Sequence, residues 1–232
     1  MDVSIDEYSD SFYNKFEESE YQINQGASVL LIKRDKIYFA LAKEKSWKYD
    51  DGVPIIKFTG IGGTREKEEK IMDTLKRELY EEVEISIDRL CFPKINETLI
   101  VKNYEENSKI KFKNCNTPNP LYVVDYRLPL REDVKSYGKK YSCLQLFVYI
   151  AKVSEDCEIK PRENDNITGI ISANKQQLNN YIDGNYKVNI RENNITWKNK
   201  YKDIEEIIVN PKFTPQGLKK AGLTLENLLK LF

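Results

Sequence analysis

The 232-residue sequence contains no histidine. This absence excludes catalytic triads, metal sites and general bases that depend on imidazole, so any general base must be a carboxylate, a lysine, a tyrosine or a cysteine. Cysteine is scarce, and its four residues form no C-x-x-C pair: Cys91, Cys115, Cys143 and Cys157. That usage is typical of a reduced, cytoplasmic protein.

A charge imbalance is also missing, because 37 basic residues balance 37 acidic ones. The net charge therefore gives no reason to expect nucleic acid or an anionic membrane as a partner. The longest apolar runs, at 27–32 and 144–151, are too short to span a bilayer. The acidic N-terminus lacks the apolar core of a signal peptide, so we expect no secretory leader.

The sequence does contain a glycine-rich stretch at 60–63, followed by a charged run to Ile85. Apolar residues in this run recur at helical spacing and predict one buried helix face: Ile71, Met72, Leu75 and Leu79. Glu78, Glu81 and Glu82 share that spacing and lie beside the apolar stripe, so we expect the helix to aim the three carboxylates at one point. Carboxylates at this density suit Mg²⁺ or Mn²⁺. A solvated, salt-bridged helix face is the alternative interpretation.

The full spacing can be written G-x5-E-x7-R-E-[apolar]-x-E-E-x-G-[apolar]. The chain matches it over 23 residues with Gly63, Glu69, Arg77, Glu78, Leu79, Glu81, Glu82 and Ile85. This pattern resembles the Nudix box, the signature of the Nudix hydrolase superfamily. One position departs from it, because Glu84 stands where the box has its second glycine.

The resemblance implies that the three glutamates are catalytic ligands of Mg²⁺ or Mn²⁺. Arg77 would pair with an acidic side chain and orient it. Glu69 would support the metal site directly or through water, and the carbonyl of Gly62 would add a ligand, while Gly63 would permit the tight turn. Without the usual glycine, either Glu84 accepts a strained left-handed conformation or the helix ends differently.

The resemblance also implies an α/β (α+β) fold, an α/β/α sandwich with a mixed central sheet. Strand patterns occur at 27–33, 36–43, 54–58, 97–102, 109–113, 121–128, 144–153, 167–172 and 187–196, with a hairpin at 34–35 and the most central strand at 144–153. Helices are expected at 174–182 and after the caps Thr214 and Thr224. Polar loops are expected at 46–52 and in an exposed insertion at 128–141.

We divide the chain into an acidic, aromatic-rich N-terminal extension (1–25), a Nudix hydrolase domain (26–185) and a C-terminal extension that packs on it (186–232). The helix-like spacing of the N-terminal aromatic residues indicates that this extension docks on the domain. The leucines near the C-terminus either bury against the domain or form a dimer contact, so monomer and homodimer both stay open.

Two further sets of residues have candidate roles. Trp47 and Tyr49 could stack on a substrate base, or merely cover the end of the sheet. In the resembling family a further carboxylate after a late strand acts as metal ligand or general base. Glu163 has that position, Asp165 is its rival, and a simply solvated loop carboxylate is the alternative.

Three functional hypotheses follow. The first is a metal-dependent hydrolase that cleaves the diphosphate bond of a nucleoside diphosphate linked to another group, X, which the box leaves unspecified. The second is a nucleotide-sensing module that binds without cleavage. The third is an interaction scaffold with an incidental acidic helix, which would show no metal dependence.

Overall fold

The computed structural model describes residues 3–16, 21–103, 105–113, 117–130, 141–163, 165–184, 186–190 and 195–232. The helices of this part of the chain are α1 (Ile5–Phe16), α2 (Ile71–Val83), α3 (Lys175–Asp183), α4 (Phe213–Lys220) and α5 (Leu225–Leu229). Short 3-10 turns are η1 (Glu44–Ser46), η2 (Ile87–Arg89) and η5 (Asn199–Tyr201). The strands are β1 (Tyr21–Lys33), β2 (Lys36–Leu41), β3 (Lys48–Asp50), β4 (Val53–Thr59), β5 (Ile61–Thr64), β6 (Leu90–Cys91), β7 (Thr98–Lys102), β8 (Ser108–Ile110), β9 (Tyr122–Pro129), β10 (Tyr141–Val153), β11 (Gly169–Ala173), β12 (Tyr186–Asn189), β13 (Ile195–Trp197) and β14 (Glu206–Pro211).

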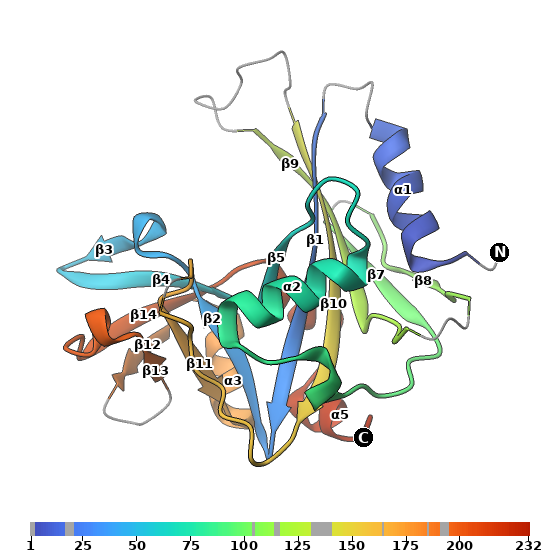
Figure 1. Ribbon diagram of the computed structural model, residues 1–232. Helices are drawn as coiled ribbons and strands as arrows, with labels where there is room; N and C mark the ends of the chain where they lie inside the picture. Colours follow the sequence, from blue (N-terminus) through green and yellow to red (C-terminus); the bar gives the residue numbers. More distant parts are fainter. Residues whose placement is uncertain are drawn as a thin grey trace.

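These strands form one mixed sheet, whose main path is β12-β14-β4-β2-β1-β10-β9-β7-β8 (Figure 1). Its centre is the long parallel pair of β1 and β10, in register from Tyr21 opposite Tyr141 to Ile32 opposite Lys152. Both strands are buried over most of their length, as expected for strands covered on both faces. The predicted mixed α/β fold, with the strand at 144–153 in the middle, is confirmed.

Two apolar cores lie on opposite faces of this sheet, because successive strand residues point to opposite sides. Leu30 of β1 belongs to the core under α3, α4 and α5. Its neighbours Val29 and Leu31 belong to the core under α2, where they meet Leu75 and Leu79. Helices therefore cover both faces, and the molecule has three layers.

Local signals in the sequence explain several element boundaries. The expected hairpin forms between β1 and β2, with Arg34 in the left-handed region at φ 56°. Helix α3 begins after Asn174, whose side chain accepts from the N–H of Gln177 in a capping box. Thr224 caps α5 by accepting from the N–H of Asn227. These predictions are confirmed.

Three local predictions need correction. The expected loop at 46–52 contains β3, which forms a hairpin with β4 through Asp51 and Gly52, both with positive φ, as a two-residue Asp-Gly turn favours. The glycine stretch is strand β5, paired with β1, rather than only a turn. Helix α4 begins at Phe213, one residue before the expected cap Thr214.

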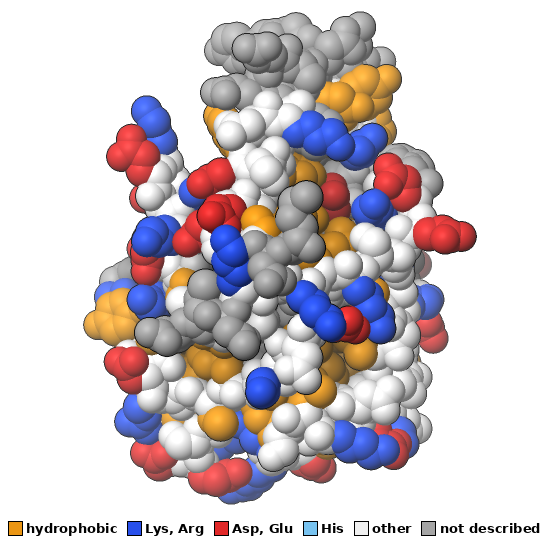
Figure 2. All heavy atoms as spheres, turned by 90° about the vertical axis from the view of Figure 1, so that its right-hand side faces the viewer, with side chains coloured by type: hydrophobic (Ala, Val, Ile, Leu, Met, Phe, Trp, Pro, Cys, Tyr) orange, Lys and Arg blue, Asp and Glu red, His pale blue; other side chains and the backbone are white. Residues whose placement is uncertain are grey.

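Helix α1 packs on the sheet through Tyr8, whose ring lies edge-on to Phe112 and Phe147. On the face of the molecule that Figure 2 shows, Lys and Arg side chains are interspersed with Asp and Glu. In the described part of the chain, no helix is long and apolar enough to cross a membrane. Most of the predicted insertion at 128–141 and part of the predicted strand at 187–196 lie outside the described residues. The division into three segments stays a prediction.

Candidate active site

The glycine strand β5 brings α2 close to the centre of the sheet. Gly62 has φ 146°, and a Cβ there would lie 2.2 Å from the carbonyl oxygen of Ala27 on β1. At Gly63, a Cβ would lie 2.3 Å from Oε1 of Glu78. Gly62 therefore requires glycine for its backbone conformation and its contact with β1, whereas a side chain at Gly63 would displace the carboxylate of Glu78.

Helix α2 has the buried stripe that the sequence predicts, formed by Ile71, Leu75 and Leu79. Of the two alternatives for the end of α2, the structure has the first: Glu84 adopts the left-handed conformation (φ 56°, ψ 28°) and donates its N–H to the carbonyl of Tyr80. Glutamate accepts here the conformation that the glycine of the box would adopt without strain.

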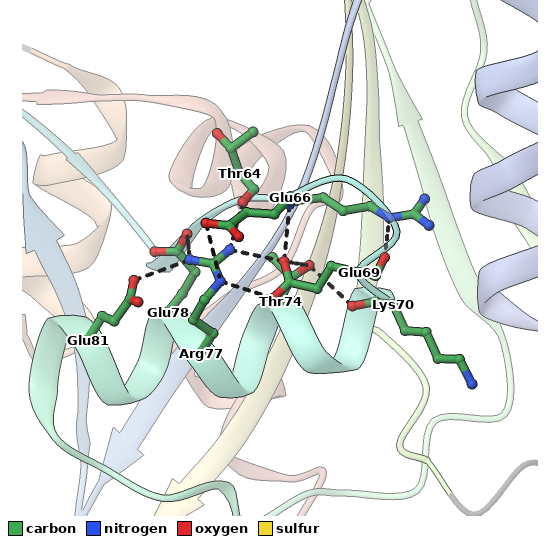
Figure 3. Close-up of polar contacts among 9 residues, drawn as sticks. Thr64, Glu66, Glu69, Lys70, Thr74, Arg77, Glu78 and Glu81 are labelled. Carbon is green, nitrogen blue, oxygen red and sulfur yellow. Dashed lines mark hydrogen bonds and ion pairs between the residues drawn. The ribbon is translucent and has the colours of Figure 1, made fainter.

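Arg77 is the centre of the polar contacts on the outer face of α2 (Figure 3). Its Nε and Nη2 donate to the two carboxylate oxygens of Glu69 at 2.9 and 3.0 Å. Its Nη1 donates to Glu78 at 2.8 Å and to Glu81 at 3.2 Å, and Nη2 also donates to the carbonyl of Thr64 at 3.0 Å. A single guanidinium thus fixes three carboxylates to the loop before the helix.

Glu69 is firmly held in this arrangement. Besides Arg77, the hydroxyl of Thr74 donates to it at 2.9 Å, and the backbone N–H of Glu66 donates at 3.1 Å. The hydrogen bonds from Arg77 are the main reason that the pKa of Glu69 falls to about 2, and the hydrogen bond to Glu69 raises the pKa of Arg77. Glu69 is therefore ionised and fully engaged, as a residue that orients Arg77 would be.

Glu82 points into the protein and is 7% exposed. One carboxylate oxygen accepts from the N–H of Gly62 at 2.8 Å. Burial raises the pKa of Glu82 well above its ordinary value, and the charges of Glu78 and Asp165 raise it further. Burial also raises the pKa of Glu78, as do Glu81 and Asp165, while Arg77 lowers it. Negative charge at this point is thus only partly compensated.

The loop between β10 and β11 brings a fourth carboxylate to the same place. The backbone N–H of Arg162 donates to the carbonyl of Glu82 at 2.8 Å and ties the loop to α2. Asp165 has a buried Oδ2 without a hydrogen-bond partner among the described residues. Glu163 instead is exposed and accepts from the N–H of Asn199 at 3.1 Å. Of the two loop carboxylates, Asp165 is the one whose charge acts on Glu82 and Glu78, whereas Glu163 is turned toward Asn199.

Lys198 is a residue of this site that the sequence analysis missed. It is 5% exposed, and its Nζ donates to the backbone carbonyl of Asp165 at 2.7 Å. Burial lowers its pKa, whereas the charges of Asp165, Glu163 and Glu82 raise it. Its place follows from the pairing of β13 with β11, a tertiary contact that no local pattern reveals.

The three box glutamates do not converge on one point as the helical spacing suggested. Arg77 holds Glu78 and Glu81, whereas the N–H of Gly62 holds Glu82, and Glu81 is 47% exposed. Across the residues that the structure describes, no three His, Cys, Asp or Glu side chains are arranged to hold a metal ion. The site as it stands is thus a charged network stabilised by hydrogen bonds.

Trp47 and Tyr49 lie apart from this network. Trp47 donates its indole N–H to the carbonyl of Ala42 at 2.8 Å and packs against Trp197 and Tyr201. Tyr49 is 62% exposed on β3. Both line a hollow of about 380 Å³ that contains no box residue. These contacts agree with the interpretation that Trp47 covers the end of the sheet.

A larger pocket of about 560 Å³ lies beside the loop that leads into α2. Its walls come from α1, from β1 and from the segment Thr64–Glu68. Arg65 closes one side, because it donates to Ser9, to Asp10 and to Gln25. The N-terminal helix is thus joined to the loop of the box by side-chain hydrogen bonds.

No protein-family model and no curated protein matches the chain. Among solved structures, it is similar to a Nudix-family hydrolase from Clostridium perfringens, with 17% identity and a TM-score of 0.40 over 68% of this chain and 86% of that one. It is also similar to a MutT protein from Bacillus halodurans, with 15% identity and a TM-score of 0.37 over 67% of this chain and 71% of that one. A NUDIX hydrolase from Nitrosomonas europaea has 11% identity and a TM-score of 0.35 over 68% of this chain and 76% of that one.

Proposed function

We propose that this protein is a metal-dependent hydrolase that cleaves the diphosphate bond of a nucleoside diphosphate linked to another group, X. The observation that carries the proposal is the partly compensated negative charge of Glu78, Glu82 and Asp165. Two of these carboxylates have raised pKa values, and the third has a buried oxygen without a partner. Folding three acids together in this way is unfavourable unless a cation joins them.

The donor set fits Mg²⁺ or Mn²⁺, because hard carboxylate oxygens are the ligands that these ions prefer. Glu78 and Glu82 would hold the ion, with substrate phosphate oxygens and water as further ligands. When bound, such an ion neutralises charge on the diphosphate and lowers the pKa of a water molecule. Glu81, at the exposed edge of the same helix, is a further candidate ligand.

The remaining residues position these groups. Arg77 fixes Glu78 and Glu81 and is itself fixed by Glu69. Asp165 is our candidate for the general base, because its free Oδ2 can accept the proton of the attacking water. Water then adds to one phosphorus, the bond from that phosphorus to the bridging oxygen breaks, and the products are two monoesters or a monoester and an inorganic phosphate compound.

The test is a screen of nucleoside triphosphates, nucleotide sugars and dinucleotides with Mg²⁺ or Mn²⁺, with the products identified by mass. Glu82→Gln should abolish turnover, because the buried ligand is lost while its hydrogen bond from Gly62 can persist. Glu84→Gln, at the end of the same helix, is the matched control and should retain activity. Turnover by Glu82→Gln at the wild-type rate would contradict the proposal.

A nucleotide-sensing module without hydrolysis is the second candidate. The separate tethering of the box glutamates favours it, since a site that never holds a metal ion has no need for convergent carboxylates. Calorimetry that detects tight nucleotide binding, with no product formed in Mg²⁺, would support this candidate instead. A cytoplasmic setting is part of both candidates, and the described cysteines Cys91, Cys143 and Cys157, all free thiols, support it.

A further inference from the structure

We propose that Arg65 is a positioning residue of the acidic site, because it couples helix α1 to Glu69 of the box. This inference rests on the proposed function and adds to it a role for the N-terminal extension. Helix α1 is then part of the scaffold that orients the carboxylates, rather than a segment that only covers the sheet. A single guanidinium, on a side chain that is 16% exposed, forms the connection.

Arg65 follows directly after β5, and its side chain contacts α1 and the box at the same time. Its backbone N–H donates to the carbonyl of Gln25 at 2.8 Å and continues the pairing of β5 with β1. Nη1 donates to Oγ of Ser9 at 2.9 Å, to Oε1 of Gln25 at 3.1 Å and to Oδ1 of Asp10 at 3.1 Å. Nε donates to the backbone carbonyl of Glu69. The planar guanidinium thus binds α1 through one nitrogen and the box through another.

The α1 end of this connection is fixed to the centre of the sheet. Ser9 is fully buried, and its backbone carbonyl accepts from the side-chain amide of Gln25 at 2.7 Å. The same amide donates to Oε1 of Gln145 at 2.9 Å, and these two glutamines lie opposite each other in the parallel pair of β1 and β10. Moving α1 away from the sheet would leave these buried polar groups without partners, which is unfavourable.

Glu69, at the other end of the connection, is held through both its backbone and its side chain. Arg65 binds its carbonyl, and Arg77 binds both oxygens of its carboxylate. Arg77 also donates to Glu78 and Glu81, two of the box glutamates. The position of Glu69 therefore determines where the guanidinium of Arg77 lies, and with it the two carboxylates that Arg77 holds.

The loop between β5 and α2 is strained and lacks a side-chain cap of its own for the helix. Glu68 has φ 65°, in the left-handed region that is unfavourable for a residue with a side chain. Lys70 precedes α2 without a capping hydrogen bond, and Asp6 of α1 instead accepts from the N–H of Ile71 at 3.3 Å. Figure 1 shows α1 beside this loop. Helix α1 thus supplies two contacts, at Arg65 and at Ile71, that hold the entry to α2.

Arg65→Met tests the role, since methionine keeps an apolar stem but none of the donors. We expect kcat to fall about 10-fold and KM to change less than about 2-fold, because the carboxylates lose their orientation while no substrate contact is removed. Calorimetric titration with Mn²⁺ alone should show binding that is ~3–10-fold weaker, since Arg65 acts on the ligands only through Glu69 and Arg77. Arg65→Lys should recover little, because one ammonium cannot replace two separate guanidinium nitrogens.

Two comparisons separate positioning from stability. Asn174→Ala removes the capping box of α3, on the opposite face of the sheet, and should lower the thermal midpoint by about 2–4 °C while leaving kcat and Mn²⁺ affinity unchanged. Ser9→Ala should lower kcat in the same direction as Arg65→Met. The double variant of Ser9 and Arg65 should be no less active than Arg65→Met alone, because both changes break one connection.

The outcomes distinguish this inference from the proposed function. If the wild type hydrolyses a substrate and Arg65→Met matches Asn174→Ala in kcat and Mn²⁺ affinity, the positioning role fails and the function stands. A rise in KM alone would also overturn the role. If no substrate is hydrolysed but Arg65→Met weakens Mn²⁺ binding and Asn174→Ala does not, the function fails and the positioning role stands. A wild-type protein that neither hydrolyses a substrate nor binds Mn²⁺ would overturn both.

Discussion

Replacing Glu82 by glutamine should change how the stability of the metal-free protein depends on pH. The carboxyl of Glu82 is buried, and its pKa in the folded protein is raised well above the ordinary value of 4.5. A carboxyl whose pKa rises on folding holds its proton more tightly in the native state. Its contribution to stability is therefore complete below about pH 4.5 and is lost as the pH rises toward the folded pKa.

The size of the effect follows from proton linkage. Within that window, each pH unit lowers the free energy of unfolding by about 1.4 kcal/mol for one such group. Glutamine does not titrate and can still accept the hydrogen bond from Gly62 through its side-chain oxygen. The variant should therefore be more stable than the wild type at neutral pH in the presence of a chelator, and its stability should decline less steeply from pH 5 to 7.

Urea unfolding at several pH values, with a chelator present, measures this difference. Glu84→Gln is the control, since its side chain is 55% exposed and should leave the slope unchanged. Adding Mg²⁺ should reverse the order, because the ion stabilises only the protein that keeps the carboxylate. If wild type and Glu82→Gln show the same slope without metal, our account of the buried charge is refuted.

Three further predictions concern neighbouring residues. Asp165→Asn should reduce kcat by about 100-fold or more, whereas Glu163→Gln should reduce kcat less than about 3-fold. The opposite order would make Glu163 the base. Lys198→Met should lower kcat with little change in KM, because the loop of Asp165 loses the hydrogen bond from Lys198. Lys198→Arg should recover part of the lost kcat. Unchanged kinetics in Lys198→Met would contradict this role. Glu84→Gly should raise the free energy of unfolding by about 0.5–1 kcal/mol. The reason is that the relief of left-handed backbone strain at residue 84 exceeds the loss of the exposed ion pair between Glu84 and Arg162. A lower thermal midpoint for this variant would refute the strain argument.

Sequence patterns predicted the elements that local physics determines. The stripe of Ile71, Leu75 and Leu79 predicted which face of α2 is buried, because helical spacing leaves no other choice. The resemblance predicted a tight turn at Gly63, whereas the structure has strand β5 there, and the carboxylate of Glu78 fills the space that a side chain at Gly63 would take. The pairing of Arg77 with acidic residues was also predicted, although not that it holds three of them.

Tertiary contacts determined what the patterns missed. Glu163 and Asp165 are two residues apart in one polar loop, and only the fold decides which of them faces Glu82. Lys198 reaches the site through the pairing of β13 with β11, far from the box in sequence. The convergence of three glutamates was inferred from helical spacing alone, which fixes backbone positions but not the hydrogen bonds that turn each carboxylate.

Calorimetric titration of the wild-type protein with Mn²⁺ at pH 6, in buffers of different ionisation enthalpy, tests most directly whether the acids of α2 bind a cation. We expect saturable binding that releases protons, because carboxyls with raised pKa values must lose them to become ligands, and we expect this binding to disappear in Glu82→Gln. Absence of binding, or binding that Glu82→Gln leaves intact, would contradict the proposed metal site.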